Sequence, residues 1–332
     1  MKKCLPLYSL LIMVILYSCS SRDKKQPEEI LNNPPFKGLT DSIRRFPNNP
    51  VLYMERAVLL SQLDLHELAT PDYKKLWELQ PEEPIALQYV SNLMLVNKPQ
   101  EAVAFLKACL NKWPASPDLH RRLTEIYAQS NQPAKAVQEY DQWLQQDSMN
   151  FEAWYEKGVL LIKIKDTPAA IQAMERSYQL RPINYNGLVL ASLYAATLNP
   201  KALTICDELL AKDTSGIIND VLYLKGSYYS DTKQYDKARA LFDECIRRDW
   251  KFADAYIEKG IVMYDQKKYD SALDVFVMAA TVAHTNPDAY YWMARTFEVM
   301  GKQEQALLNY KRAVAIDTSF AEAKAGIRRL KR

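Results

Sequence analysis

Two stretches near the C-terminal end of the chain share one pattern of small, bulky and polar positions. AYIEKGIVMYDQKKYDSALDVFVMAA (255–280) and AYYWMARTFEVMGKQEQALLNYKRAV (289–314) both place a small residue five positions after the first alanine, and another alanine twelve positions after that. The later alanine recurs along the chain at intervals of 32 to 36 residues, at Ala69, Ala102, Ala136, Ala170, Ala202, Ala238, Ala272 and Ala306. The chain therefore contains about eight copies of one unit.

Other columns repeat with the same interval. The small residues are Ala57, Ser91, Thr124, Gly158, Ala191, Gly226, Gly260 and Ala294. A bulky residue precedes most of them by four positions, although His120 and Gly187 interrupt this column. Proline follows three of the early units at Pro81, Pro114 and Pro182, where it ends a helix because it cannot continue one. Residues 183–221 hold the most irregular spacings, which indicates either a longer loop or a bend there.

These columns resemble the signature of the tetratricopeptide repeat, a unit of two antiparallel helices. The resemblance covers residues 48–318 and implies an all-α fold, a right-handed superhelical solenoid of helix-turn-helix units. Two helices approach closely only where their contact residues are small, and stacked units form a continuous core that one unit cannot form alone. We expect residues 36–47 and 319–332 to form capping helices at the two ends.

The N-terminal segment has the features of an export signal. Lys2 and Lys3 precede Leu5–Tyr17, thirteen residues without a charge. A helix needs about 20 apolar residues to cross a bilayer, so this stretch is too short to span one. A positive start, a short apolar run and a small residue at Ser18 together predict a signal peptide over residues 1–18.

Residues 16–19, Leu-Tyr-Ser-Cys, resemble the lipobox of bacterial lipoproteins, although a residue smaller than Tyr17 is usual. The resemblance implies that Cys19 is acylated and becomes the first residue, with residues 19–35 as a flexible tether. It further implies a protein of the bacterial cell envelope, anchored by lipid and facing the periplasm. Ser20 favours the outer over the inner membrane. The alternative is a plain export signal with an incidental cysteine.

The charge composition of the chain indicates which classes of partner it does not suit. The chain has 43 Lys and Arg against 40 Asp and Glu, a net charge of +3, which argues against nucleic acid as the main partner. Hydrophobic residues make up 48% of the chain, enough for a folded core. Only eight glycines are present, which suits a mostly helical protein.

No catalytic or metal-binding motif stands out. Beyond Cys4 and Cys19, the cysteines are Cys109, Cys206 and Cys245, which we expect to be small buried residues; a Cys206–Cys245 disulfide is the alternative. The chain lacks HExxH, GxSxG, a Walker loop, GxGxxG and any Cys/His cluster for zinc. The sequence therefore predicts a protein that is not an enzyme and needs no cofactor or metal.

The resemblance implies that the first helix of each unit lines a concave groove for a peptide or a partner helix. The groove candidates are Asn92, Arg121, Glu125, Tyr155, Tyr223, Tyr264, Tyr291 and Arg295. Tyr155, Tyr223 and Tyr291 occupy one frame position, where a ring with a polar tip suits a wet interface. Tyrosine is also ordinary at this position in the family, so a packing role is the alternative.

The groove is predicted to be mildly acidic, with one basic spot at Arg121 and Arg122. Its acids are Glu55, Glu125, Glu156, Asp231, Glu258, Asp265 and Glu298, against Arg121, Arg122, Lys163 and Arg295. Acids near the helix starts, such as Asp254 and Asp288, are explained by the helix dipole alone.

The sequence thus predicts an envelope scaffold that binds one or more proteins and holds an assembly together. Two alternatives are a lipoprotein that captures glycan or peptide ligands and an accessory subunit of an envelope enzyme complex. Self-association into a homo-oligomer is a further expectation that the sequence does not decide.

Overall fold

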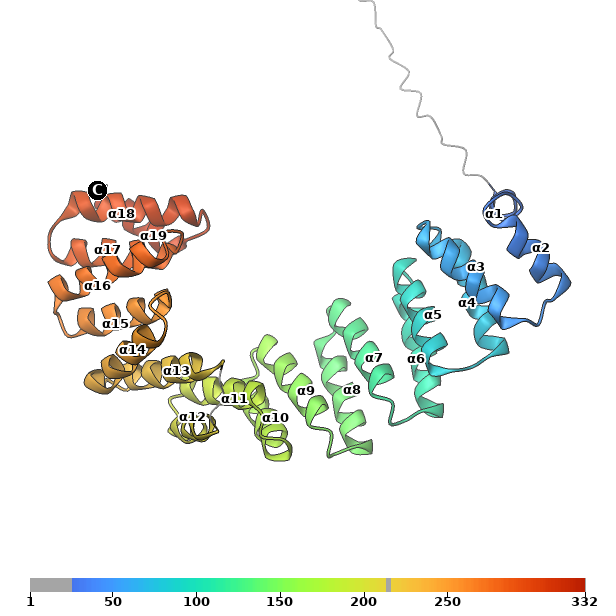
Figure 1. The fold of residues 1–332 in the computed structure, drawn as a ribbon, viewed down its shortest axis with the longest axis horizontal. Coiled ribbons are helices and arrows are strands. Elements are labelled where there is room, and N and C mark those ends of the chain that lie inside the picture. The colour runs from blue at the N-terminus through green and yellow to red at the C-terminus, as the bar shows by residue number, and fades with distance from the viewer. Residues whose placement is uncertain (1–25, 213–215, 332) are drawn as a thin grey trace, which may run out of the picture. The chain divides into compact units, whose positions relative to one another are not determined.

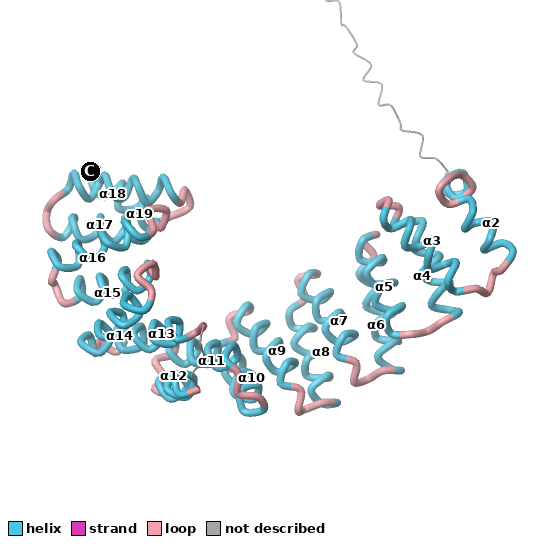
Figure 2. The backbone as a smooth tube through the Cα atoms, in the orientation of Figure 1, coloured by secondary structure: helices cyan, strands magenta, loops and turns pink. Residues whose placement is uncertain are grey.

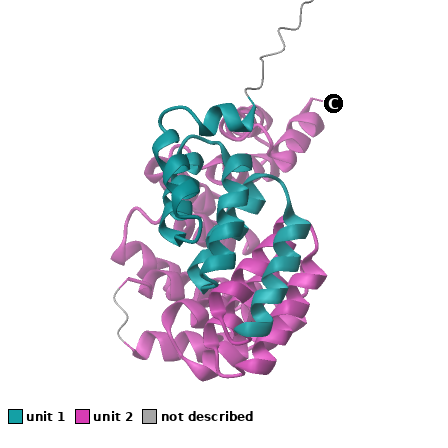
Figure 3. Cartoon of the chain, turned by 90° about the vertical axis from the view of Figure 1, so that its right-hand side faces the viewer, with its two compact units in different colours: residues 1–113 teal, residues 114–332 magenta. Residues whose placement is uncertain are grey.

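The structure is a computed structural model that describes residues 26–212 and 216–331. These residues form helices and connecting loops, with no strand among them (Figure 2). The chain divides into two compact units, residues 1–113 and 114–332 (Figure 3). The all-α prediction is confirmed.

Unit 1 contains two N-terminal helices followed by two helix pairs (Figure 1). The helices are α1 (Pro27–Leu31), α2 (Lys37–Arg45), α3 (Pro50–Gln62), α4 (His66–Leu79), α5 (Glu83–Leu95) and α6 (Pro99–Lys112). Each helix from α2 to α5 packs on the next one in sequence.

Unit 2 contains helix pairs in the same arrangement and ends on a single helix. Its helices are α7 (Pro117–Gln129), α8 (Pro133–Gln146), α9 (Phe151–Lys163), α10 (Thr167–Leu180), α11 (Asn184–Ala196), α12 (Lys201–Ala211), α13 (Ile218–Asp231), α14 (Tyr235–Arg248), α15 (Ala253–Asp265), α16 (Tyr269–Val282), α17 (Pro287–Val299), α18 (Gln303–Ile316) and α19 (Ala321–Leu330). The two helices of a pair pack together, and the second helix packs on the first helix of the next pair.

The small column marks the place where the two helices of a pair touch. A Cβ added at Gly226 would lie 2.7 Å from the Phe242 ring, and one at Gly158 would lie 2.7 Å from Met174. The large residue comes in both cases from the second helix of the same pair. The recurring alanines of the second helices are buried, with at most 1% of their surface exposed. In these pairs a large side chain of the second helix therefore packs on a residue of the first helix that has no side chain.

The turn inside each pair contains one residue with a positive φ angle. These residues are Asp64, Asn97, Asn131, Lys165, Leu198, Lys233, Lys267 and Gly301. The left-handed conformation ends the first helix and reverses the chain direction. The second helix can then pack antiparallel on the first.

The fifth pair, α11 and α12, is the irregular one. Gly187 interrupts the bulky column because a Cβ there would lie 2.7 Å from the Tyr178 ring of α10 and 3.0 Å from Leu209. The Tyr178 ring fills the space that a bulky residue fills elsewhere. α12 has 11 residues, whereas α10 has 14. α10, α12 and α14 start 34 residues apart, but Ala202 is the second residue of α12 whereas Ala170 and Ala238 are the fourth residues of their helices, which accounts for the uneven spacing of the alanine column.

The N-terminal end differs from the expected flexible tether over residues 19–35. Residues 27–31 form α1, and the Thr40 hydroxyl donates a 2.7 Å hydrogen bond to the Leu31 carbonyl oxygen. Phe36 is buried, so this part of the chain packs on unit 1. A short helix without buried residues and one hydrogen bond to α2 therefore lie in a stretch whose polar, proline-bearing composition predicts a spacer. The predicted signal peptide and Cys19 lie outside the described residues.

Helices also lie where the two capping helices are expected. At the C-terminal end, Arg329 of α19 donates two hydrogen bonds, of 2.6 and 2.7 Å, to the carboxylate of Glu298 on α17. This paired geometry fixes the last helix against the last helix pair. Across residues 26–212 and 216–331, no helix has the length and apolar character needed to cross a bilayer.

The small-to-large contact predicts the effect of adding one carbon. We expect Gly226→Ala to lower the free energy of unfolding by about 1–3 kcal/mol, because the new methyl group overlaps the Phe242 ring. Urea unfolding followed by circular dichroism measures the change. Gly38→Ala in α2 is the control, because nothing lies within 4 Å of its added Cβ. Equal effects of the two substitutions would contradict this account.

Candidate functional site

The candidate site is built on the first helices of the pairs in unit 2. α11 contacts α13, α13 contacts α15, and α15 contacts α17, so these helices lie next to one another (Figure 1). We call the solvent-accessible residues of α7, α9, α11, α13, α15 and α17 the first-helix face. Most of the predicted groove residues belong to it, and the structure separates them into three groups.

The first group surrounds Arg121 on α7. Its guanidinium group lies 2.8 Å from Glu156, 3.2 Å from Asp118 and 3.8 Å from Glu152. Glu156 also accepts a 3.3 Å hydrogen bond from the Tyr140 hydroxyl. Arg121 is therefore neutralised by a network that joins α7 to α9.

Glu125 is also engaged, because one of its carboxylate oxygens lies 3.0 Å from the Arg122 guanidinium. The predicted basic spot at Arg121 and Arg122 is therefore wrong as a free positive surface. Acids of the same face and the neighbouring helix cover both guanidinium groups.

The second group is a set of carboxylates around Glu258 on α15. Burial, together with the neighbouring charges of Asp231, Asp254, Asp265 and Asp288, raises the pKa of Glu258 to about 7. Asp231 comes from α13 and Asp288 from α17, so three helices contribute to the set. Within the described ranges, none of these five carboxylates forms an ion pair. This part of the face is negative and uncompensated.

The lysines of the same helices point elsewhere. Lys225 on α13 donates to the Asp207 carboxylate on α12, and Lys259 on α15 lies 2.5 Å from Asp243 on α14. Each of these lysines reaches the second helix of the preceding pair. The pairing holds the positive charge at the junction between pairs and away from Glu258.

The third group is aromatic and surrounds Arg295 on α17. Its guanidinium carbon lies 5.1 Å from the ring centre of Trp292, 5.5 Å from Tyr264 and 6.0 Å from Tyr291. Cation–π attraction to these rings holds Arg295 in place. Tyr264 also packs edge-on against Trp292, with ring centres 5.5 Å apart. The structure thus brings together three predicted site residues, Tyr264, Tyr291 and Arg295.

The three tyrosines of one frame position all pack on the following pair. Tyr155 meets Tyr185 at 4.7 Å, Tyr223 meets Phe252 at 5.4 Å, and Tyr291 meets Phe320 at 5.0 Å between ring centres. The partner aromatic in each case stands at or near the start of the next first helix. The structure therefore gives these tyrosines a packing role, and a binding role for them stays a prediction.

Comparison with known proteins decides the family. Tetratricopeptide repeat models match residues 93–157, and 151–184 together with 220–249. The chain is a tetratricopeptide repeat protein. Among solved structures, it is similar to PilW, described as a type IV pilus biogenesis factor, at 15% identity and a TM-score of 0.53, covering 65% of this chain and 98% of that one.

Other relatives agree with this family. The C-terminal part of a tetratricopeptide repeat protein from Cytophaga hutchinsonii matches at 16% identity and a TM-score of 0.50, over 72% of this chain and 98% of that one. The human mitochondrial import receptor subunit TOM70 is 25% identical over 210 residues, 59% of this chain and 34% of the relative. The chain thus spans about a third of the length of this curated relative.

Asn92 of the second repeat is buried, at the edge of a cavity of about 260 Å³ that Ser61 and Leu87 also line. α5 begins 33 residues after α3, whereas α7 begins 34 residues after α5. This shift places Val90, which is fully buried, in the small column instead of Ser91. Asn92 turns toward α4, where its amide donates hydrogen bonds to the Thr70 hydroxyl at 2.8 Å and the His66 carbonyl oxygen at 3.2 Å. A turn one residue shorter thus gives Asn92 a packing role, and a binding role for it stays a prediction.

The buried polar and thiol groups have structural roles. His120 and Glu139 are 2.7 Å apart, but both are about 95% buried, and the second ring nitrogen of His120 bonds to the Pro114 carbonyl oxygen. The three described cysteines are free and buried, so no Cys206–Cys245 disulfide forms. Burial raises the pKa of Cys206 to about 12 and that of Cys109 to about 11, which keeps these thiols protonated at neutral pH.

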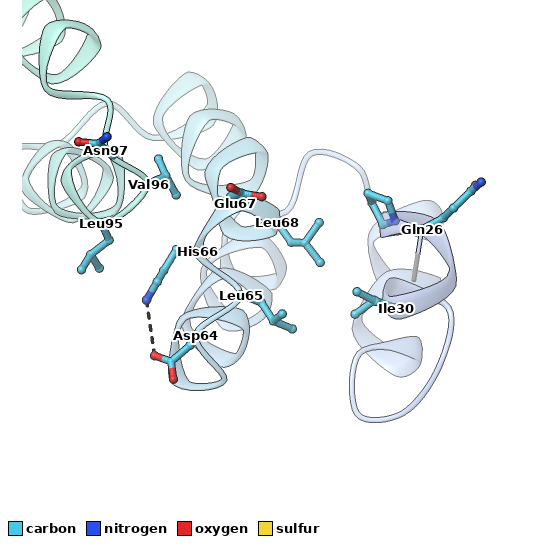
Figure 4. A pocket seen from close by; sticks show the side chains of 11 residues that line it. Gln26, Ile30, Asp64, Leu65, His66, Glu67, Leu68, Leu95, Val96 and Asn97 are labelled. Carbon is cyan, nitrogen blue, oxygen red and sulfur yellow. Dashed lines mark ion pairs between the residues drawn. The ribbon is translucent and has the colours of Figure 1, made fainter. Parts of the chain in front are cut away.

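A cavity of about 690 Å³ lies in unit 1 (Figure 4). Pro27 and Ile30 of α1 line one side, and residues from the start of α4 and the end of α5 line the other. Its rim carries an Asp64–His66 pair at 3.7 Å. None of the predicted groove residues lines this cavity, so it gives no support to them.

The predicted acidity of the groove is unevenly distributed. Glu125, Glu156 and Glu298 each have an arginine partner, whereas Asp231, Glu258 and Asp265 have none among the described residues. The sequence identifies these acids but not all of their partners, because Arg121 and Arg329 reach carboxylates on other helices. Lysine one position before the small column, at Lys157, Lys225 and Lys259, binds an acid of the preceding second helix in each case.

The raised pKa of Glu258 predicts a pH-dependent stability. The folded protein holds this proton more tightly than the unfolded chain, whose carboxyl has a pKa near 4.5, so stability falls as pH rises from about 4.5 to about 7. Glu258→Gln removes the charge and should be the more stable protein at pH 8, by up to about 3 kcal/mol. The difference should vanish near pH 4.

Urea unfolding at a series of pH values measures this effect. Asp270→Asn is the matched control, since it removes an exposed carboxylate from α16 in the same repeat. If Asp270→Asn changes the pH profile as much as Glu258→Gln does, the cause is net charge and not the surroundings of Glu258.

Proposed function

We propose that this tetratricopeptide repeat protein is a non-catalytic scaffold, anchored by lipid on Cys19 in the bacterial cell envelope, that binds a segment of a partner protein on the first-helix face of unit 2. The observation that carries the proposal is the uncompensated charge around Glu258 beside the aromatic group around Arg295. Carboxylates that find no counter-charge among the described residues, beside partly exposed aromatic rings, are suited to a partner outside the chain.

The family supports a binding role. Stacked helix pairs present one continuous face built from successive first helices, and such repeat surfaces suit extended protein ligands. The human relative is named as a receptor subunit for mitochondrial import, which fits the recognition of protein segments. By this analogy the chain is an adaptor or receptor for envelope proteins.

The location rests on the N-terminal sequence. Residues 16–19 resemble a lipobox, and Ser20 favours the outer membrane. Acyl chains contribute about 0.8 kcal/mol per buried CH₂, so two or three chains hold a protein durably at a membrane. Anchoring in this proposal depends on Cys19 alone.

Site-specific photocrosslinking tests the binding face. A photoreactive amino acid at Ser192 on α11 or Asp265 on α15 should capture a partner protein in living cells, because both positions are exposed on first helices. The same amino acid at Lys237 on α14 or Lys311 on α18 is the control, since both are exposed on second helices. Mass spectrometry of the adducts identifies what is bound.

Adducts from the second-helix positions alone would place binding on the other side of the repeats. Adducts from neither set would mean that unit 2 holds no partner in the cell. Either result overturns the proposed binding face.

Metabolic labelling tests the anchor. Radiolabelled palmitate should enter the wild-type protein and be absent from Cys19→Ala, which should leave the membrane fraction because its tether is lost. Cys109→Ala is the control, since Cys109 is buried and should leave the label unchanged. Label that persists in Cys19→Ala would refute lipidation at this residue.

A further inference from the structure

We infer that the segment bound by the first-helix face of unit 2 is cationic and amphipathic, with lysine or arginine side chains against the carboxylates of α13, α15 and α17 and apolar side chains against α9 and α11. The inference rests on the proposed function and specifies the chemical class of the partner. Three observations on the face carry it.

The acidic part has no internal source of positive charge. Asp231, Glu258 and Asp265 form no ion pair within residues 26–212 and 216–331, and the nearby Lys225 and Lys259 are bound to acids of second helices. Arg295, the arginine on α17, is held among aromatic rings. A ligand with positive side chains supplies the missing counter-charges, and a polyanion or an anionic membrane surface is repelled.

The charge is arranged for an extended ligand. The carboxylates stand on the first helices of three successive pairs, α13, α15 and α17, and no three acidic, histidine or cysteine side chains in the described part of the chain gather closely enough to hold a metal ion. A peptide carrying positive side chains at intervals can instead meet one helix after another. This distribution favours a chain of several charges over a single bound cation.

The neighbouring part of the face is apolar and exposed. Val159 and Ile162 on α9 are 42% and 38% exposed, and Tyr185 on α11 is 44% exposed. The Tyr155–Tyr185 contact joins α9 to α11, and α11 packs on α13. The apolar part therefore continues directly into the acidic part, and one ligand can cover both.

Fluorescence anisotropy with two synthetic peptides tests the inference on the full chain in detergent micelles. One fluorescein-labelled peptide repeats Leu-Lys-Lys-Gly three times, and the other repeats Leu-Glu-Glu-Gly three times. We expect the lysine peptide to bind and the glutamate peptide not to bind. Raising NaCl from about 50 to about 300 mM should weaken binding several-fold, because salt screens exposed charges.

A matched pair of triple variants locates the charge. Asp231→Asn, Glu258→Gln and Asp265→Asn together remove three carboxylates from the first helices α13 and α15, and should weaken the lysine peptide about tenfold or more. Asp236→Asn, Asp270→Asn and Glu304→Gln together remove three exposed carboxylates from the second helices α14, α16 and α18. This second-helix triple variant is the control, and its affinity for the lysine peptide should differ from that of the wild type by less than twofold. Circular dichroism verifies that both variants keep the wild-type helix content.

A second variant tests the apolar part. Ile162→Ser should weaken binding of the leucine-containing lysine peptide several-fold. It should leave binding of a Ser-Lys-Lys-Gly version unchanged, because only the first peptide has apolar side chains that can contact Ile162. Equal weakening of both peptides would contradict the assignment of the apolar residues to α9.

The outcomes separate this inference from the proposed function. Equal losses in the two triple variants, or equal binding of the two peptides, would overturn the inference. If photocrosslinks form at Ser192 and Asp265 while the lysine peptide does not bind, the face binds a partner of another class and only the inference fails. If neither crosslinks nor peptide binding occur, the proposed function fails with it.

Discussion

The contact between a residue with almost no side chain on one helix and a large side chain on the next recurs through the structure. A Cβ at Gly158 or Gly226 would overlap Met174 or Phe242, and a Cβ at Gly326 would overlap the Tyr310 ring. The two helices can pack this closely only because one of them has no side chain at the point of contact. The direction of each pair, the burial of the alanines on the second helices and the stacking of successive pairs all depend on this close approach.

The sides of the first helices that face neighbouring helices are occupied by packing contacts. Charged and aromatic residues can therefore occupy the side that faces solvent. The lysines beside the small column bind acids of the preceding second helix, as Lys259 binds Asp243, and so contribute to joining the pairs. The carboxylates around Glu258 are then left without an ion-pair partner among the described residues. The uncompensated charge around Glu258 is thus a consequence of how the pairs are joined, and it costs stability in the free protein. A ligand with positive charge would offset this repulsion between carboxylates, so its binding would be favoured.

Aromatic residues illustrate how packing and binding compete for one position. Tyr155, Tyr223 and Tyr291 each touch an aromatic at the start of the next first helix, so truncating them would loosen the junction between pairs. Exposed residues such as Ser192 and Asp265 report on binding without this complication. The same reasoning separates Arg121, whose charge is used within the protein, from the acids of α15, whose charge is not.

The repeat, the helix pairs and the burial of the cysteines could be predicted from the sequence by itself, because the spacing of small and bulky residues is a direct record of helix contacts. The expectations that differ from the structure concern positions that local packing decides. Asn92 is buried because a turn one residue shorter rotates α5, and residues 27–31 of the predicted spacer form α1, whose end accepts a hydrogen bond from Thr40. The sequence also identified the acids of the first helices, but only the tertiary structure decided which of them are paired. Ion pairs such as Arg121–Glu156 and Arg329–Glu298 join different helices. The distance between their charged groups depends on how the helices pack, which residue spacing in the sequence does not give.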